Sequence, residues 1–279
     1  MSEQLALLRE ITLPAMVERS IKLLQTHEPS EGYYGCFSGG KDSCVIKELA
    51  RMAGVKATWH YNVTTIDPPE LLWFIKKNHP DVVWEKPPCG NFFSMMEKRG
   101  IPTRKCRWCC SEYKEMRSPR RAVLLLGVRS AESPRRAAAW KEVTQHRATK
   151  SYAVSPILKF TDQQVWEFIN STGIPYCSLY NEGFKRLGCI GCPMGGKHRL
   201  AEFARWPKYE ALWKRAFQRV WHRRTHDSPY QKDGREWFGS AKFSNWEELW
   251  DWWLSDLGLP GNEEDSCQLA LDMFSGGNE

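Results

Sequence analysis

The sequence lacks a long apolar run and also lacks the pattern of a secretory leader. No stretch approaches the ~20 consecutive apolar residues that a membrane-spanning helix requires. Residues 1–20 contain no basic segment followed by an apolar segment, which is how a signal peptide begins. These two absences exclude the membrane-spanning and secreted classes. We therefore expect a cytoplasmic protein without a membrane partner.

Composition sets the size and general class of the protein. A chain of 279 residues with 42% apolar content can form one large α/β domain, or one domain with a smaller appendage. The net charge of +7 permits a polyanionic partner without requiring one. Ten cysteines in a long chain without a leader favour metal binding or catalysis over a disulfide scaffold.

The first part of the chain alternates between short apolar runs and amphipathic segments. This alternation indicates βαβ units, and therefore an α/β fold with a parallel sheet covered on both faces. The predicted strands are residues 32–37, 55–63, 81–85 and 122–128, and the predicted helices are residues 5–26, 42–53, 68–78, 91–99 and 161–173.

The last third of the chain has a different pattern. Beyond about residue 175 the strand signal disappears, and apolar residues from Tyr209 to Trp221 recur every three or four positions, as on one helix face. Residues 245–257 predict a second aromatic helix. We expect three parts: an N-terminal helix at 1–30, a nucleotide-binding α/β domain at 31–175, and a cysteine-containing, Trp- and Arg-rich helical extension at 176–279.

The segment CFSGGKDSCV, residues 36–45, places two glycines where a predicted strand ends and a helix begins. At such a junction, free backbone N–H groups and the helix dipole favour an anion. The Walker A spacing is absent, which disfavours an NTPase that cleaves the γ-phosphate. An ordinary Gly-Gly turn is the simpler alternative. Small residues, hydroxyls and a cation are available to a phosphate here: Gly39, Gly40, Ser38, Ser43 and Lys41.

SGGKDS is the PP-loop signature, and by it the chain is identified as a member of the adenine nucleotide α-hydrolase-like superfamily of ATP pyrophosphatases and sulfonucleotide reductases. Members bind the phosphates of ATP or of an adenylyl sulfate on a Rossmann-like sheet, and the ATP-using ones cleave between the α and β phosphates. The resemblance implies catalytic roles for Lys41 and Asp42, with Mg²⁺ neutralising the departing pyrophosphate. The implied phosphate site is Ser38, Gly39, Gly40, Lys41, Asp42 and Ser43.

Two further segments narrow the resemblance to the phosphoadenylyl-sulfate (PAPS) reductase-like family. They are LLLGVRSAESPRRA at 124–137 and SPILKFTDQQVWEFINSTGIPYCSLYNEGFKRLGC at 155–189, so the resemblance covers about residues 32–195. TTIDPPE at 64–70 is more similar to prophage- and island-encoded members. Arg129 becomes a third catalytic candidate. Around it, residues that follow a buried strand's carboxyl end suit a phosphate ligand: Gly127, Arg129, Arg135 and Arg136.

Five cysteines occur in two motifs, CRWCC at 106–110 and CIGC at 189–192. A tandem pair followed far downstream by C-x-x-C resembles the [4Fe–4S] ligand set of the assimilatory adenylyl-sulfate reductases, in which Lys114 also has a counterpart. Adjacent cysteines are poorly placed to hold one metal ion, whereas a cluster offers each a different iron. With Cys106 in place of Cys110, the alternative is a tetrahedral zinc set. The implied cluster ligands are Cys109, Cys110, Cys189 and Cys192.

The C-terminal region departs from the sulfonucleotide reductases, whose catalytic cysteine lies in a Glu-Cys-Gly-x-His context. The only late cysteine is Cys267, in EEDSCQLAL, and its acidic surroundings oppose the lowered thiol pKa that an attacking thiolate needs. The chain is therefore more similar to tRNA thiolases and to the sulfur transferases of DNA phosphorothioation. We expect ATP-dependent adenylylation and sulfur transfer to a nucleic acid (DNA or tRNA) or a nucleotide, with a sulfur donor such as a cysteine desulfurase.

Two other functions stay open. A true adenylyl-sulfate or PAPS reductase would release sulfite and use thioredoxin or glutathione, whereas a nucleotide-sensing subunit would bind ATP without turnover. The acceptor and the oligomeric state are not indicated. Residues 197–224 carry a basic face that either contacts nucleic-acid phosphates or is simply solvated: Lys214, Arg215, Arg219, Arg223 and Arg224.

Overall fold

In the computed structural model, contacts divide the chain into two compact units that interleave in the sequence. The first unit comprises Met1–Asn62, Pro69–Glu85 and Met116–Leu187, and the second comprises Val63–Pro68, Lys86–Glu115 and Gly188–Glu279. The domain boundaries that we expect at residues 30 and 175 stay a prediction, because they divide the chain into consecutive segments, whereas these units are each built from several segments. The structure describes residues 12–115, 119, 121–145, 152–226 and 242–255.

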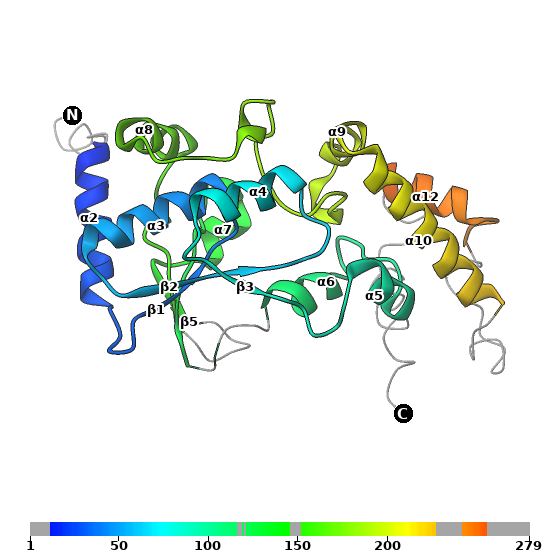
Figure 1. The fold of residues 1–279 in the computed structure, drawn as a ribbon, viewed down its shortest axis with the longest axis horizontal. Coiled ribbons are helices and arrows are strands. Elements are labelled where there is room, and N and C mark those ends of the chain that lie inside the picture. Colours follow the sequence, from blue (N-terminus) through cyan, green and yellow to red (C-terminus); the bar gives the residue numbers. More distant parts are fainter. Residues whose placement is uncertain (1–11, 116–118, 120, 146–151, 227–241, 256–279) are drawn as a thin grey trace, which may run out of the picture. The chain divides into compact units, whose positions relative to one another are not determined.

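The first unit contains a six-stranded sheet with the strand order β3-β2-β1-β4-β6-β5. Neighbouring strands pair in parallel, except that β5 is antiparallel to β6. The predicted α/β fold with a parallel sheet is therefore confirmed, with an antiparallel strand added at one edge. The strands are β1 (Tyr33–Cys36), β2 (Ala57–Asn62), β3 (Val83–Glu85), β4 (Val123–Leu125), β5 (Val143–Gln145) and β6 (Tyr152–Val154) (Figure 1).

The helices of this unit begin and end where the sequence chemistry directs. Pro14 lies in the first turn of α2, where a missing N–H costs nothing. Thr161 and Gln164 form a capping box at the start of α8. Gly54, with φ of +69°, ends α3 in the left-handed region. The helices are α2 (Leu13–Thr26), α3 (Lys41–Ala53), α4 (Pro69–Asn78), α7 (Pro134–Ala139) and α8 (Asp162–Thr172), with 3₁₀ turns η2 (Ser130–Glu132) and η3 (Ser178–Tyr180).

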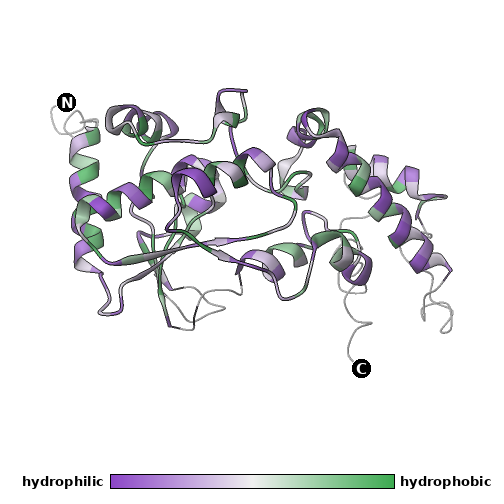
Figure 2. Cartoon of the chain, in the orientation of Figure 1, coloured by the Kyte–Doolittle hydropathy of each residue, from purple (hydrophilic) through white to green (hydrophobic). Residues whose placement is uncertain are grey.

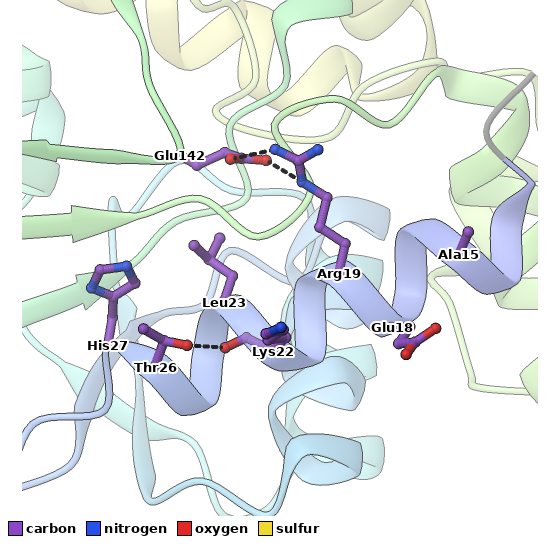
Figure 3. Close-up of a pocket in the computed structure, with 8 residues that line it drawn as sticks. All are labelled: Ala15, Glu18, Arg19, Lys22, Leu23, Thr26, His27 and Glu142. Carbon is purple, nitrogen blue, oxygen red and sulfur yellow. Dashed lines mark hydrogen bonds and ion pairs between the residues drawn. The ribbon is translucent and has the colours of Figure 1, made fainter. Parts of the chain in front are cut away.

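Helix α2 packs against the unit through one face. Hydrophobic and hydrophilic residues alternate along it (Figure 2), and Leu24 is fully buried. The buried Ser20 hydroxyl donates to the carbonyl of Pro156 at 2.6 Å. On the outer side, Arg19 forms a two-point ion pair with Glu142, which precedes β5, at 3.1 and 2.9 Å (Figure 3). Residues 5–11 of the predicted helix lie outside the described part of the chain.

A buried histidine, His79, directly follows α4 and contacts side chains of α3. Only 8% of His79 is exposed, and its ring packs against Phe37 with 4.7 Å between centroids. Its Nε2 lies 3.9 Å from the sulfur of Cys44, and its Nδ1 lies 3.3 Å from the ammonium of Lys47. Burial, with the Lys47 charge adding to it, lowers the pKa of His79 to about 4. His79 is therefore neutral in the folded protein near pH 7.

The second unit is helical around an aromatic core. Trp213 is fully buried and stacks on Trp253 with 4.8 Å between ring centroids, while Phe92 lies 5.1 Å away on another side. The predicted cysteine-bearing helical extension is confirmed, with Pro207–Thr225 forming one long helix. The elements are α5 (Phe92–Arg99), α6 (Trp108–Cys110), the π-turn η1 (Ser111–Glu115), η4 (Pro193–Gly195), α9 (His198–Arg205), α10 (Pro207–Thr225) and α12 (Trp246–Ser255).

Candidate active site

The glycine-rich loop of the first unit connects β1 to α3, and its first glycine is required for two reasons. Gly39 has φ of +73°, in the left-handed region that residues with a Cβ rarely adopt. A Cβ at this position would also lie 2.7 Å from Cδ1 of Leu71 and 2.8 Å from Cδ1 of Ile75, both on α4. The loop therefore lies directly against α4, a contact that was not predicted from the sequence.

The loop ends at the N-terminus of α3. The first main-chain bond of the helix runs from the N–H of Cys44 to the carbonyl of Gly40, at 3.1 Å, so the N–H groups of the preceding turn point out of the helix. The Ser43 hydroxyl donates to that same carbonyl at 2.8 Å, and the Ser38 hydroxyl donates to Ser43 at 3.3 Å. With the helix dipole, this end of α3 can bind an anion.

Two cations and two carboxylates surround the start of α3. Lys41 and Arg129 are 5% and 3% exposed. The Asp42 carboxylate accepts from Nε of Arg129 at 2.6 Å and from the Lys41 ammonium at 3.5 Å. Asp162, the first residue of α8, accepts from Arg129 Nη2 at 2.7 Å and lies 3.2 Å from the Lys41 ammonium. The three predicted catalytic residues therefore lie together, and Asp162 joins them.

The same charges affect the two carboxylates differently. Burial raises the pKa of Asp42 above its ordinary value, and this outweighs the effect of Lys41 and Arg129. Burial also opposes ionisation of Asp162, but there the two cations prevail and the pKa falls below the ordinary value. The side chain of Asp162 is 64% exposed, which explains its weaker desolvation. The two cations therefore favour the ionised form of Asp162 more than burial opposes it, whereas at Asp42 burial has the larger effect.

The second predicted ligand segment follows β4. A Cβ on Gly127 would lie 3.3 Å from the backbone of Asp42, so the absence of a side chain lets this segment approach α3. The N–H of Arg129 donates to Glu132 at 3.1 Å, and Glu132 also forms an ion pair with Arg136. Gly127 and Arg129 therefore lie at the glycine-rich loop, whereas the Arg136 side chain forms an ion pair with Glu132, four residues before it. The side chain of Arg135 lies outside the described residues.

Tyr180, the last residue of η3, contacts the glycine-rich loop and was not predicted from the sequence. Its hydroxyl accepts the backbone N–H of Lys41 at 2.9 Å, and a Cβ on Gly40 would lie 3.4 Å from the same oxygen. Asp162 was predicted only as the start of a helix. Both residues lie more than a hundred positions from the loop in sequence, so only their inclusion in the segment 155–189 could have indicated them.

The second unit brings the two cysteine motifs together around one small cavity. Its volume is about 30 Å³, which is enough to admit water. Thr64, Lys114 and several aromatic rings complete the wall. Cys106 is not part of the lining; it is 3% exposed, and its N–H bonds to Thr103 at 3.0 Å. The predicted ligands that line the cavity are Cys109, Cys110, Cys189 and Cys192.

The thiols and the lysine in this cavity interact electrostatically. A hydrogen bond with Cys109 lowers the pKa of Cys110 to about 6, with Lys114 adding to the effect, and the same bond raises the pKa of Cys109. Burial raises the pKa of Cys189 to about 11. The pKa of Lys114 is raised, mainly by Cys189, although its side chain keeps contact with solvent.

The donor set around the cavity fits a thiolate-bound metal group. Four thiols face one space, and an ammonium beside them can offset the negative charge that four thiolates bring. Across the described residues, no three His, Cys, Asp or Glu side chains converge closely enough to hold a metal ion. Among the described residues, the four thiols that could serve a cluster therefore line one cavity without forming a single-ion site.

The combination of loop and cysteine motifs matches a known family over more than half of the chain. Residues 33–194 match the phosphoadenosine phosphosulfate reductase domain. The chain belongs to this family. The PP-loop, the Gly127–Arg129 segment and both cysteine motifs of the PAPS reductase domain lie within the matched residues.

Relatives of this PAPS reductase-family chain include archaeal, viral and bacterial proteins. An uncharacterized Methanocaldococcus jannaschii protein is 31% identical over 165 residues, or 56% of this chain and 40% of the relative. An uncharacterized protein of Escherichia phage 186 is 34% identical, over 43% of this chain and 41% of the relative. The chain thus spans about two fifths of the length of these relatives. Adenosine 5'-phosphosulfate reductase of Staphylococcus epidermidis is 26% identical, over 60% of this chain and 72% of the relative.

Solved structures similar to this one include a phosphoadenylyl-sulfate reductase from Candida auris in a phosphate complex. It is 16% identical with a TM-score of 0.48, over 65% of this chain and 96% of that one. A Candida glabrata FMN adenylyltransferase in complex with ATP is also 16% identical, with a TM-score of 0.46 over 64% of this chain and 61% of that one.

The basic face predicted on residues 197–224 is partly used within the second unit. Lys214 pairs with Glu210 at 2.7 Å, Arg219 pairs with Glu97 on α5, and Arg224 donates to the carbonyl of Lys98 at 3.2 Å. Arg215 and Arg223 are exposed on α10. Among the helices that the structure describes, none has the length and apolarity to cross a bilayer.

Proposed function

We propose that this protein is an ATP-using PP-loop enzyme that adenylylates an acceptor and then transfers sulfur to it. The observation that carries the proposal is the pair of buried cations, Lys41 and Arg129, at the N-terminus of α3. Both are held in place by Asp42. A polyphosphate is the ligand class that such a site suits, because guanidinium, ammonium and helix-end N–H groups all favour phosphate oxygens.

In the proposed first step, an acceptor oxygen attacks the α-phosphorus of ATP. The bond from that phosphorus to the bridging oxygen of the β-phosphate breaks, and pyrophosphate leaves with the electron pair. Lys41 and Arg129 stabilise the charge that develops on the phosphates. Asp42 is the carboxylate at the loop that could hold Mg²⁺ beside the bound phosphates, and Mg²⁺ would neutralise pyrophosphate. A sulfur nucleophile at the oxidation level of sulfide then displaces AMP from the activated acceptor.

The triphosphate has to compete with Asp162 for the two cations. Asp162 lies 3.2 Å from the Lys41 ammonium and 2.7 Å from Arg129, but its side chain is 64% exposed. A carboxylate in that position can turn to solvent when a more highly charged anion arrives. Asp42, which is less exposed and contacts the same cations, would keep Arg129 oriented during the exchange.

We further propose that the cysteines of the second unit hold a [4Fe–4S] cluster. Cys109 and Cys110 both line the cavity, which supports the cluster over a zinc site that uses Cys106. When bound, such a cluster supplies redox and sulfur-binding chemistry that thiols alone do not have. The acceptor would be a DNA, a tRNA or a nucleotide, and Arg215 and Arg223 on α10 offer positive charge toward a polyanion. A cysteine desulfurase is the kind of donor that would supply the sulfur as a persulfide, which a thiol reductant would convert to the sulfide level by two electrons.

A second candidate is a reductase that releases sulfite from an adenylyl sulfate. It is favoured by the named relative, the Staphylococcus epidermidis adenosine 5'-phosphosulfate reductase. Such an enzyme needs an attacking cysteine thiolate. Cys267, the candidate for that role, lies outside the described residues.

Anaerobic purification with iron, sulfide and zinc analysis, followed by two assays, separates these functions. We expect iron and sulfide to co-purify, and ATP-dependent pyrophosphate release to rise when tRNA or DNA is added. The Lys41→Ala variant should lose pyrophosphate release, while the matched Lys77→Ala variant, an exposed α4 lysine that stacks on Trp73, should keep it. Zinc without iron would contradict the cluster. Sulfite release from adenylyl sulfate, abolished by Cys267→Ser, would establish the reductase instead.

A further inference from the structure

The turn between Cys189 and Cys192 is held by three other segments of the second unit. The N–H of Ile190 donates to the carbonyl of Ile66 at 2.8 Å. The carbonyl of Ile190 accepts the indole N–H of Trp213 at 3.0 Å. The N–H of Gly191 donates to a carboxylate oxygen of Glu202, on α9, at 2.7 Å. The residues between the two cysteines are therefore hydrogen-bonded on several sides.

Gly191 lies where a side chain could not be accommodated. Its φ is +76°, and a Cβ there would lie 2.7 Å from both Trp213 Nε1 and Phe203 Cζ. A turn whose central residue is pressed against two aromatic rings cannot shift toward them. The Glu202 carboxylate fixes it from a further direction through a charge-assisted hydrogen bond, which is stronger than a neutral one.

Helix α9, which carries Glu202, is itself anchored by a buried arginine. Arg199 is 1% exposed, and its guanidinium lies 4.3 Å from the ring centroid of Trp253. It donates through Nε to the carbonyl of Gly196 at 3.2 Å and through Nη2 to that of Leu254, on α12, at 3.4 Å. The carboxylate of Glu202 is therefore presented to the cysteine turn by a helix that is fixed at its own start.

We propose that Glu202 is a positioning residue for the Cys189 and Cys192 thiols. Its carboxylate holds the Gly191 N–H, and so sets the direction in which the cysteines on either side present their sulfurs. This inference rests on the proposed function, in which both thiols are iron ligands. Outer-shell groups that orient ligands typically contribute about 10- to 100-fold to metal affinity.

Three substitutions in the full-length protein test the role. Glu202→Ala removes the acceptor, and Glu202→Gln keeps an amide oxygen in its place. Glu210→Ala is the control, because the Glu210 carboxylate forms an ion pair with Lys214 on its own helix. In protein without metal, hydrogen exchange of the Gly191 amide is measured. After anaerobic reconstitution with ferrous iron and sulfide, the rate of iron loss to a chelator is measured from the charge-transfer absorbance.

In the Ala variant, we expect roughly 10-fold or more loss of Gly191 amide protection and about 10- to 100-fold faster iron loss. The Gln variant, which keeps a neutral acceptor, should lie between wild type and Glu202→Ala. The Glu210→Ala control should stay close to wild type in both measurements. Wild-type iron loss in Glu202→Ala would overturn the inference. If Glu202→Ala fails to fold by circular dichroism, Glu202→Asp, which draws the carboxylate back by one methylene, gives the second test. Wild-type exchange of the Gly191 amide together with wild-type iron loss in that variant would overturn the inference as well.

These outcomes are distinct from failure of the proposed function. Wild-type protein that takes up no iron and sulfide would overturn the cluster, and with it the role of Glu202 toward iron. Wild-type protein that takes up both, together with unaltered iron loss in Glu202→Ala, would leave the cluster standing and remove only the positioning role.

Discussion

Replacing Gly39 by alanine tests whether the PP-loop owes its shape to contact with α4. Gly39→Ala places a methyl group 2.7 Å from Leu71 and 2.8 Å from Ile75, at a φ of +73°. The left-handed conformation costs a residue with a Cβ roughly 1–2 kcal/mol. Overpacking against two apolar side chains adds about 1–3 kcal/mol. The free energy of unfolding should therefore fall by about 2–5 kcal/mol.

The chain offers a matched control at the other end of α3. Gly54 has φ of +69°, and a Cβ there would meet no atom within 4 Å. Gly54→Ala should therefore cost only the backbone term, roughly 1–2 kcal/mol. The difference between the two variants isolates the contact of the loop with α4, and corresponds to about 2–4 °C in Tm for each kcal/mol.

Urea unfolding followed by circular dichroism measures both variants, and hydrogen exchange of peptides from residues 41–53 assigns the transition to the first unit. We also expect Gly39→Ala to bind ATP more weakly than Gly54→Ala, because the methyl group displaces the loop from α4. Equal destabilisation by the two alanines would refute the reasoning, since it would show that Leu71 and Ile75 do not constrain the loop.

Three other predictions concern charged groups of the first unit. Arg129→Met leaves the Asp42 carboxylate without its main partner and should lower the free energy of unfolding by about 3–5 kcal/mol in urea, with partial recovery on adding Asp42→Asn; wild-type stability of the single variant would contradict this. Because burial and then Lys47 lower the pKa of His79 to about 4, from 6.5, stability should be full above pH 6.5 and fall by up to about 3 kcal/mol toward pH 4. His79→Phe should remove this dependence of the free energy of unfolding on pH, measured by unfolding at a series of pH values. An unchanged dependence would show that His79 is not the group that titrates. Asp162→Asn should tighten ATP binding by up to about 5-fold in calorimetry, because an exposed ion pair contributes at most about 1 kcal/mol; weaker binding would show that Asp162 assists the ligand.

Much of the first unit could be predicted because its signals are local. Four strands and four helices follow from apolar runs and from end signals such as the Thr161 cap that begins α8 and Gly54, which ends α3, and the structure confirms them. The short strands β5 and β6 were missed. Each has three residues, so neither shows a long apolar run. Strand β5, with the sequence VTQ, lies at the edge of the sheet, where only one side of a strand pairs with a neighbour. A sheet partner, which lies elsewhere in the chain, decides such a strand.

The candidate sites divide in the same way. The glycine-rich loop could be recognised because its residues are consecutive and each has a separate physical reason to be there. Tyr180 and Glu202 could not, because each acts on a backbone N–H, which carries no sequence signal of its own. Any residue that the fold brings within hydrogen-bond distance could serve that N–H, so only the structure identifies which one does.

The sequence by itself determined that glycines and hydroxyls lie at the start of α3, where they suit an anion, since these features act over a few consecutive residues. It also determined which cysteines were available as ligands. The tertiary structure decided that Asp162 joins Asp42 on the two buried cations and that Cys106 is excluded from the cavity of the other four thiols. Electrostatic interactions and ligand sets depend on distances across the fold, and a one-dimensional pattern does not contain those distances.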